Sequence, residues 1–410
     1  MTAAATGRIR SLSDKTEASI PMPVINRVAD LADEIAAWRR DFHQNPELLF
    51  DVHRTAGVVA DKLKAFGCDE VATGIGQTGV VAVIKGKRGT SGKVIGIRAD
   101  MDALPIEEDT GAPYASKVPG KMHACGHDGH TAMLLGAAKY LAETRNFDGT
   151  AVMIFQPAEE GGGGGDAMVK DGLMERFGVQ EVYGLHNMPG IPVGQFALRP
   201  GPLMAAADRF DIVIEGKGGH AARPHECVDT LLVAAQVVNA LQTIASRNVD
   251  PLESVVVSVC AFNAGEAYNV IPQTAHLKGT VRSLTDKVRD LAEARLKAIV
   301  EATCAAHGAT AKVDYRRGYP VTVNHPEQTD FLARIAAEVG GERAVDTTIA
   351  PLMGSEDFSY MLESRPGAYI FMGNGATASV HHPKYDFNDE AIPYGVSLWA
   401  KVVETAMPAR

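Results

Sequence analysis

Apolar residues recur at two spacings along the chain, and these spacings separate predicted helices from predicted strands. Helical spacing begins near Ile25, runs through Trp38 to about Phe42, and returns over Thr55–Phe66. Further strands are expected at Val80–Lys85, Lys93–Ala99, Thr150–Phe155 and Glu181–Leu185, and helices at Gly129–Glu143 and Asp166–Gly172. Asp128 is a suitable residue to cap the Gly129 helix. This alternation predicts an α/β domain with a mainly parallel sheet flanked by helices.

The pattern changes between about Gly201 and Gly318. The expected elements there are a strand (Asp208–Glu215), a helix (Val228–Arg247), two strands (Ser254–Phe262 and Thr274–Arg282), a helix (Asp286–His307) and a strand (Thr310–Arg316). This βαββαβ order is ferredoxin-like. A helix near Asp330–Val339, a strand near Ala368–Met372 and a final helix from Tyr394 follow it. We therefore expect an α/β domain formed by residues 21–200 and 319–410, interrupted by an inserted α+β domain over residues 201–318.

Composition excludes several classes of partner. The chain has 410 residues, enough for two or three domains, and a net charge of −10 without any basic run. An acidic chain of this kind is a poor nucleic-acid binder, because phosphate binding needs clustered Lys and Arg. No run approaches the roughly 18 apolar residues that span a bilayer, so we expect no membrane partner.

Cysteine usage and the N-terminus indicate the compartment. The five cysteines are widely spaced and form no C-x-x-C pair, which argues against a disulfide framework. About the first twenty residues lack the apolar segment of a signal peptide, and we interpret them as a loose extension. The sequence thus predicts a soluble, cytoplasmic protein.

Side chains that bind metals follow the predicted strands. Asp100 and Asp102 follow the strand ending at Ala99, Glu159 and Glu160 follow Phe155, His186 follows Leu185, and His381 and His382 lie a short loop after Met372. Ligand sites in open α/β sheets lie beyond the carboxyl ends of the strands. We therefore expect these acids and histidines to converge on one crevice. Cys125 and His127, in the turn before the Gly129 helix, are placed to join them.

A cysteine, several histidines and a glutamate form a set that binds divalent transition metals. The thiolate favours Zn²⁺ without excluding Mn²⁺, Co²⁺ or Ni²⁺. In an adjacent pair such as Glu159 and Glu160, one carboxylate can bind metal while its neighbour serves as general base toward a water molecule. The glycines Gly161–Gly165 remove side chains beside this pair and leave room for substrate or metal.

Each of these residues also has a more ordinary interpretation. Cys125 alone is more often a small buried apolar residue, adjacent glutamates are usually solvated, and His186 alone is more often a hydrogen-bonded core histidine. The combination favours chemistry, because its chain order and strand-end positions are not expected of random surface residues.

Familiar motifs of other classes are missing or misplaced. Gly74–Gly79 matches G-x-G-x-x-G, but a predicted strand follows it instead of the helix that dinucleotide binding requires. Neither G-x-S-x-G nor H-E-x-x-H occurs in the chain.

The inserted segment has candidates of its own. Gly216–His220 is a glycine-rich loop that presents a histidine able to donate to an oxyanion. Asn269 and Arg282 lie beside its strands, and an arginine is suited to bidentate binding of a substrate carboxylate. The alternatives are a plain surface loop and a plain surface arginine.

Several stretches together resemble the aminoacylase–carboxypeptidase metallopeptidases, in the branch of hippurate hydrolases and auxin-conjugate amidohydrolases. They are Arg98–Pro105, Met122–His130, Phe155–Gly161, Gly184–His186, Gly218–Ala222, Asn269–Pro272, Met353–Phe358 and His381–Asp389. They occur in the family's order over nearly the whole chain, from about Ile25 to the end. The resemblance implies a catalytic domain with two divalent metal ions, Mn²⁺ or Zn²⁺ with Co²⁺ or Ni²⁺ as alternatives, and an inserted lid or dimerisation domain.

The resemblance also implies roles for individual residues. Cys125 matches the bridging metal ligand, with His127, Glu160, His186 and His381 as the other ligands; Glu159 matches the general base; Asp102 is similar to a carboxylate that orients a ligand; His220 matches a lid histidine that steadies the oxyanion; and Asn269 and Arg282 match contacts to the substrate carboxylate. In the family, the lid histidine often comes from the partner subunit of a dimer, so we expect a homodimer or higher homo-oligomer. One departure is His381-His382-Pro383, where the family has a single histidine; we assign the ligand to His381 because Val380 fits the preceding apolar position, and His382 is the alternative.

The predicted function is metal-dependent hydrolysis of the amide bond of N-acyl amino acids, giving a carboxylate and a free amino acid. The acyl group is open among hippurate-like, N-acetyl and other conjugates. A dipeptidase or carboxypeptidase that uses the same site is the nearest alternative. A non-catalytic metal- or metabolite-binding protein is a further alternative, but binding alone has no need of a base such as Glu159.

Overall fold

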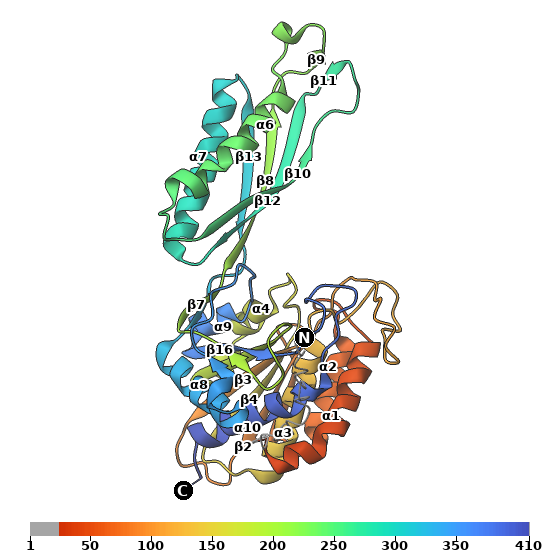
Figure 1. Cartoon of the computed structure of the whole chain (residues 1–410), viewed down its shortest axis with the longest axis vertical. Helices are drawn as coiled ribbons and strands as arrows, with labels where there is room; N and C mark the ends of the chain where they lie inside the picture. Colours follow the sequence, from red (N-terminus) through yellow and green to blue (C-terminus); the bar gives the residue numbers. More distant parts are fainter. Residues whose placement is uncertain (1–23, 410) are drawn as a thin grey trace, which may run out of the picture.

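Two sheets of different size divide the chain into an α/β body and a smaller α+β module (Figure 1). The computed structural model describes residues 24–409, so the predicted N-terminal extension lies outside the described residues. The module stands beyond the body and joins it through a narrow neck. All five cysteines are free, as their spacing predicted. Among residues 24–409 no helix is long and apolar enough to cross a membrane.

The sheet of the body has eight strands in a mixed arrangement. In spatial order they are β1 (Glu70–Ile75), β2 (Gly79–Lys85), β4 (Thr150–Gln156), β3 (Val94–Asp100), β5 (Glu181–Met188), β16 (Gly367–Gly373), β6 (Phe196–Ala197) and β15 (Val345–Asp346). The four central strands β4, β3, β5 and β16 are mutually parallel, but β1–β2, β2–β4 and β6–β16 are antiparallel. The sheet is therefore mixed: its centre is parallel, as predicted, but β2 runs against the central strands, and so do β6 and β15, which are parallel to each other. A tight turn joins β1 to β2, and only antiparallel strands can be joined so closely.

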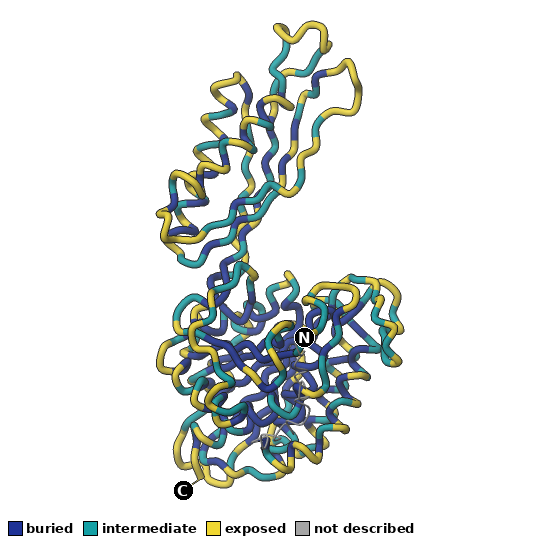
Figure 2. Tube along the Cα trace, viewed as in Figure 1, coloured by how far each residue is buried: buried dark blue, intermediate teal, exposed yellow. Residues whose placement is uncertain are grey.

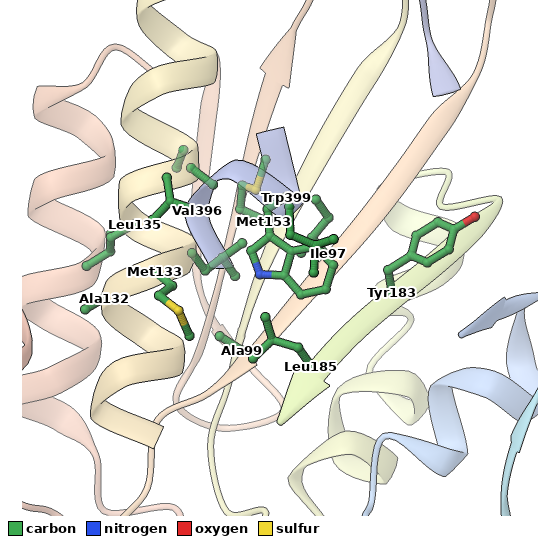
Figure 3. Packing of buried hydrophobic residues seen from close by; sticks show 14 of the residues in the cluster. Ile97, Ala99, Ala132, Met133, Leu135, Met153, Tyr183, Leu185, Val396 and Trp399 are labelled. Carbon is green, nitrogen blue, oxygen red and sulfur yellow. The ribbon is translucent and has the colours of Figure 1, made fainter. Parts of the chain in front are cut away.

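Helices cover both faces of this sheet. They are α1 (Asn26–Gln44), α2 (His53–Ala65), α3 (His127–Thr144), α8 (Pro326–Gly340) and α10 (Ile392–Ala406) on one core, and α4 (Gly164–Lys170), α5 (Leu173–Arg176) and α9 (Ser359–Ser364) on the other. Alternate strand residues point to opposite sides, so Ile97 and Met153 enter the first core and Ile154 the second. Figure 3 shows Ile97 and Met153 packed around Trp399 of α10. Burial of both faces explains why the central strands are almost continuously apolar.

The start of α3 differs from the prediction. Gly126 is the N-cap residue, with a φ of 92° that favours glycine, and Asp128 lies inside the first turn. A Cβ at Gly126 would overlap Asn187 and Tyr385, so only glycine fits there. The Asp128 carboxylate instead lies 2.9 Å from Nδ1 of His43. A tertiary ion pair has thus taken the carboxylate that the sequence suggested for capping.

The module contains the predicted succession of strands and helices. Its elements are β8 (Ala206–Glu215), α6 (Thr230–Leu241), β10 (Val255–Asn263), β12 (Thr274–Ser283), α7 (Asp286–Ala306) and β13 (Thr310–Arg317), and the antiparallel sheet has the order β10-β12-β8-β13. A separate apolar core lies between this sheet and the two helices. The helix expected over Val228–Arg247 is shorter, because a π-helical turn at Ile244–Asn248 follows α6.

Two small ribbons lie at opposite ends of the module. At the far tip, β9 (Gly219–His220) pairs with β11 (Val270–Ile271), where much of the chain is exposed (Figure 2). At the neck, β7 (Gly201–Met204) pairs with β14 (Thr322–Asn324). There the backbone N–H of Ala207 donates to the carbonyl of Tyr319 at 3.0 Å, and Gly318 N–H donates to Ala207 O at 3.0 Å. These bonds hold together the two segments of the chain that connect the body to the module.

The Ile97→Ala variant should test the core of the body. Ile97 is fully buried beside Trp399, so the substitution should lower the free energy of unfolding by about 2–5 kcal/mol. Both tryptophans, Trp38 and Trp399, lie in this core, so the urea dependence of tryptophan fluorescence reports on the body alone. The exposed Lys64→Ala on α2 is the control and should change the free energy by less than about 0.5 kcal/mol. Equal transitions for the two variants would contradict this account of the core.

Candidate metal centre

The predicted ligand residues meet at the carboxyl edge of the four central strands. Cys125 and His127 stand at the start of α3, Glu160 follows β4, His186 lies within β5, and His381 lies in the loop after β16. Their ligand atoms form two groups, Cys125–His127–His186 and Cys125–Glu160–His381, in which all atoms lie within 4.8 Å of one another. The expected convergence is therefore present, although β5 extends past His186 to Met188.

The first group has the hydrogen bonding expected of metal-ligating histidines. Nδ1 of His127 donates to the carbonyl oxygen of Asp102 at 2.8 Å, and Nδ1 of His186 donates to the carbonyl oxygen of Asn187 at 2.6 Å. With Nδ1 as the donor, neither Nε2 carries a proton, which is the tautomer in which imidazole binds metal. Nε2 of His186 lies 3.3 Å from Sγ of Cys125, and the buried Nε2 of His127 has no hydrogen-bond partner. An unpartnered buried nitrogen beside a thiol fits a cation.

The second group shares the thiol of Cys125 with the first. Nε2 of His381 lies 3.2 Å from Oε1 of Glu160, a buried oxygen that has no hydrogen-bond partner. His381 has a φ of 65°, a left-handed conformation that is rare for a residue with a side chain and is common at functional sites. A sulfur common to two three-residue groups fits two neighbouring cations.

Glu159 and Asp102 complete the centre. Glu159 forms a further close group with His127 and Glu160. The Asp102 carboxylate accepts hydrogen bonds from the backbone N–H of Glu159 at 2.9 Å and of Glu160 at 3.1 Å. It also lies 3.6 Å from Nδ1 of His127. The buried Asp102 carboxylate therefore fixes both His127 and the loop of residues 158–165 that carries Glu159 and Glu160, which we call the glutamate loop.

The electrostatics of the centre favour added positive charge. Burial raises the pKa of Glu159 well above its ordinary value, and the neighbouring Glu356 and Glu160 raise it further. Burial also raises the pKa of the Cys125 thiol. The neighbouring Cys125 and Glu160 raise the pKa of His381 to about 10. Divalent cations would favour the ionised carboxylates and thiolate and the neutral histidine, the forms that bind metal.

Buried Arg98 compensates the remaining acids beneath this centre. Its guanidinium donates to Asp100 at 2.6 Å, to Glu356 at 2.9 Å and to Asp357 at 3.0 Å. His130 uses both ring nitrogens, one toward Asp100 at 2.7 Å and one as acceptor from Asn187 N–H at 2.9 Å. These polar groups are fully engaged, so we do not assign them as ligands. Glu356 had no predicted role, although the stretch Met353–Phe358 that contains it contributed to the family resemblance.

A pocket of about 710 Å³ lies between the body and the module. The body contributes Cys125, Glu159, Glu160, His186 and His381, and the module contributes Arg209, Arg282 and Arg316. The predicted Arg282 thus reaches the site. Burial and the neighbouring Arg209 lower its pKa, because two guanidiniums face the same space. Arg209 was missed, since only the strand register, which pairs it with Thr280 and Arg316, brings it to this face.

Two predicted residues do not reach this pocket. His220 and Asn269 lie together at the tip of the module, where Ala221 N–H donates to the carbonyl of Asn269 at 3.0 Å. From Arg209 to the end of β8 at Glu215 the strand rises roughly 20 Å, and His220 lies further along the chain. Within one chain the structure therefore separates them from the metal centre. The exposed His382 also stays outside, where its Nδ1 accepts from Lys384 N–H at 3.0 Å.

Comparison with known proteins identifies relatives of this arrangement. The profile of Peptidase family M20/M25/M40 matches residues 96–405. A hippurate hydrolase of Campylobacter jejuni is 45% identical over 381 residues, 93% of this chain and 98% of that protein. Thermostable carboxypeptidase 2 of Saccharolobus solfataricus is 41% identical over 90% of this chain and 94% of its own length. The crystal structure of the Bacillus subtilis YXEP protein, a dinuclear metal-binding peptidase, has a TM-score of 0.80 and 34% identity, covering 93% of this chain and all of that one.

These likenesses extend over nearly the whole chain and include both the sheet and the glutamate loop. They confirm the resemblance that the sequence stretches indicated. The chain belongs to peptidase family M20/M25/M40.

Proposed function

We propose that this protein is an amidohydrolase that cleaves N-acyl amino acids with the help of two divalent cations. The observation that carries the proposal is the position of Glu159, whose carboxylate lies within 4.8 Å of ligand atoms of His127 and Glu160. A carboxylate in this place is suited to exchange protons with a water molecule at the centre. The related hippurate hydrolase, named for an N-acyl amino acid substrate, supports the same reaction class.

The cations would be held by the two groups that share Cys125. We propose His127 and His186 for one ion and Glu160 and His381 for the other, with the thiolate of Cys125 common to both. The ligand set suits Zn²⁺ or Mn²⁺, with Co²⁺ or Ni²⁺ as alternatives. When bound, such ions acidify water and polarise the substrate carbonyl.

The side chains of this protein would move the proton and hold the substrate. An oxygen of the Glu159 carboxylate accepts a proton from water as the water oxygen bonds to the amide carbon. Glu159 then returns the proton to the amide nitrogen as the C–N bond breaks, which yields a carboxylate and a free amino acid. Asp102 keeps Glu159 in place through its N–H, and Arg282 with Arg209 binds the substrate carboxylate.

We further propose that residues 21–200 and 319–410 form the catalytic domain, and that residues 201–318 form an inserted lid through which two copies associate. In that arrangement His220 of one copy serves the site of the other. The edge strand β10 and the tip carry exposed apolar side chains, among them Phe262, Tyr268 and Val270. An open apolar edge of this kind favours pairing with a second copy.

A carboxypeptidase is the second candidate. The related carboxypeptidase of Saccharolobus solfataricus favours it, and the same pair, Glu159 and Arg282, would cleave a C-terminal peptide bond. A dipeptidase would need a group that recognises a free substrate amine. A non-catalytic binding protein is disfavoured, because binding alone does not require Glu159.

A release assay on the purified protein tests the reaction class. We expect hydrolysis of hippurate or N-acetyl amino acids with Mn²⁺ or Zn²⁺ present. Activity should fall at least about 100-fold after chelation and return when metal is added, because the cations activate water and substrate together. Products are measured as free amino acid.

The substrate panel separates the candidates. Indole-acetyl amino acids and simple dipeptides are included beside the acyl amino acids, each with and without chelator. Cleavage of peptides alone would transfer the assignment to a peptidase. Bound metal without hydrolysis of any member would reject the proposal.

The Glu159→Gln variant tests the general base. The amide is similar in size but does not accept a proton, so kcat should fall at least about 1,000-fold. Metal content, measured by mass spectrometry, should equal that of the wild type because Glu159 is not an assigned ligand. The matched control is Glu107→Gln, an exposed carboxylate that does not line the pocket and that accepts from Gly120 N–H. Near-normal kcat in Glu159→Gln would refute the role.

Mixing two inactive variants tests whether His220 acts in the partner copy. His220→Ala lacks the tip histidine and Glu159→Gln lacks the base, so each alone should be inactive. In a mixed dimer, the site that keeps Glu159 receives an intact His220 from the other copy. Random exchange of subunits should therefore restore about one quarter of wild-type activity. No recovery after proven subunit exchange would exclude this arrangement.

A further inference from the structure

Tyr319, in the neck between the module and the body, bonds directly to the loop that carries Glu159. Its hydroxyl donates to the carbonyl oxygen of Glu159 at 2.7 Å and accepts from the backbone N–H of Gly163 at 3.0 Å. Burial raises the pKa of Tyr319, as do the nearby Asp357 and Glu159, so the phenol stays protonated and able to donate. No motif singled out in the sequence included this residue.

The loop needs anchors because its backbone is unusual. Ala158 has a φ of 52°, a left-handed conformation that is uncommon for a residue with a side chain. Gly161 and Gly163 also have positive φ, at 88° and 71°. Such conformations persist where the surroundings hold them in place. The glutamate loop therefore does not fix the direction of the Glu159 side chain by itself.

The anchors of the loop come from different directions. On the amide side, Asp102 accepts from the N–H groups of Glu159 and Glu160. On the carbonyl side, the O–H of Tyr319 and the N–H of Gly161, at 2.6 Å, donate to the same oxygen of Glu159. Asp102 lies just after β3 in the body, whereas Tyr319 lies in the neck. The peptide units on either side of Glu159 are thus held by two separate parts of the molecule.

Tyr319 also belongs to the hydrogen bonds that join the two connecting segments of the neck. Its own carbonyl accepts from Ala207 N–H at 3.0 Å, and the adjacent Gly318 N–H donates to Ala207 O and to the Asp208 carboxylate, at 3.0 and 3.1 Å. Asp208 is in turn bonded by Arg289 of α7. One residue therefore links the root of the module to the loop of the metal centre.

We propose that Tyr319 is a positioning residue that fixes the Glu159 loop to the neck of the module. It acts through the carbonyl of Glu159 and not on the substrate, so its contribution is to the geometry of the base. This inference rests on the proposed function, in which Glu159 exchanges protons with water. The phenol oxygen of Tyr319 thus couples the neck to the backbone of the base.

Tyr360 provides a matched control. Its ring lies edge-on to that of Tyr319 with centroids 6.1 Å apart, and its hydroxyl donates to Gly318 O at 3.4 Å. It shares the surroundings of Tyr319, but within residues 24–409 its hydroxyl makes no hydrogen bond to the glutamate loop. Removing either hydroxyl leaves the ring packing intact, so Tyr360→Phe isolates the effect of an oxygen bonded to the neck alone.

The experiment compares Tyr319→Phe, Tyr360→Phe and the wild type in the full-length, metal-loaded protein. Amide hydrogen exchange, followed by mass spectrometry, should accelerate in peptides covering residues 158–165 of Tyr319→Phe, because Gly163 N–H has lost its acceptor. With an N-acyl amino acid that the wild type cleaves, kcat should fall about 10- to 100-fold while KM changes less than about twofold. Metal content and the thermal midpoint should match the wild type, and added Mn²⁺ or Zn²⁺ should not restore activity.

Three outcomes would overturn the proposal, and the first two concern Tyr319→Phe itself. One is unchanged exchange over residues 158–165 in Tyr319→Phe, and the other is a kcat within about twofold of the wild type. An equal fall of kcat in Tyr360→Phe would also overturn it, since the effect would then belong to the neck in general. If the wild type cleaves no substrate, the proposed function fails, and the exchange measurement alone still decides whether Tyr319 holds the loop.

Discussion

The site depends on one buried cation, the guanidinium of Arg98. An uncompensated carboxylate in a protein interior costs several kcal/mol, and three acids lie together beneath the metal centre. Arg98 donates to all three, Asp100, Glu356 and Asp357, and takes up Gln156 with its remaining Nε–H at 2.8 Å. Because Arg98 compensates their charge, these acids can form hydrogen bonds with other groups of the site. Asp100 orients His130, and Asp357 accepts from Gly165 N–H at 2.8 Å at the end of the glutamate loop.

The four parallel central strands place the reactive groups beside the acids that Arg98 compensates. Each central strand carries or precedes at least one group of the site at its carboxyl end, and short bonds between neighbouring strand ends keep those groups in register. Asp102, just after β3, accepts from the loop after β4, and the carbonyl of Asp102 orients His127. Strands β2, β6 and β15 run against the four central strands and contribute no ligand, so their direction did not affect the prediction of the site.

Local features were predictable from sequence, and features set by pairing between distant segments were not. Ligands such as Glu160 and His186 were found because they lie at the ends of strongly apolar strands. Strand β1 was missed because Glu70, Thr73 and Gly74 interrupt its apolar residues and are exposed, and the strand is held by pairing with β2. Arg209 was missed for a similar reason, since its position depends on the register of β8 with β12 and β13. The pattern of a single element does not contain that register.

The arrangement of the module has a consequence for how the whole enzyme would work. Arg209 and Arg282 lie at the root of β8 and β12 and face the pocket of their own chain, whereas His220 lies roughly 20 Å or more further along. A sheet is stiff along its strands, so bending the module does not bring its tip to its root. If His220 contributes to the reaction, it serves the pocket of a second copy, and each pocket takes its carboxylate-binding arginines and its base from one chain and its oxyanion donor from another. A substrate would then contact both copies, so substrate binding and subunit association would strengthen each other by the same factor.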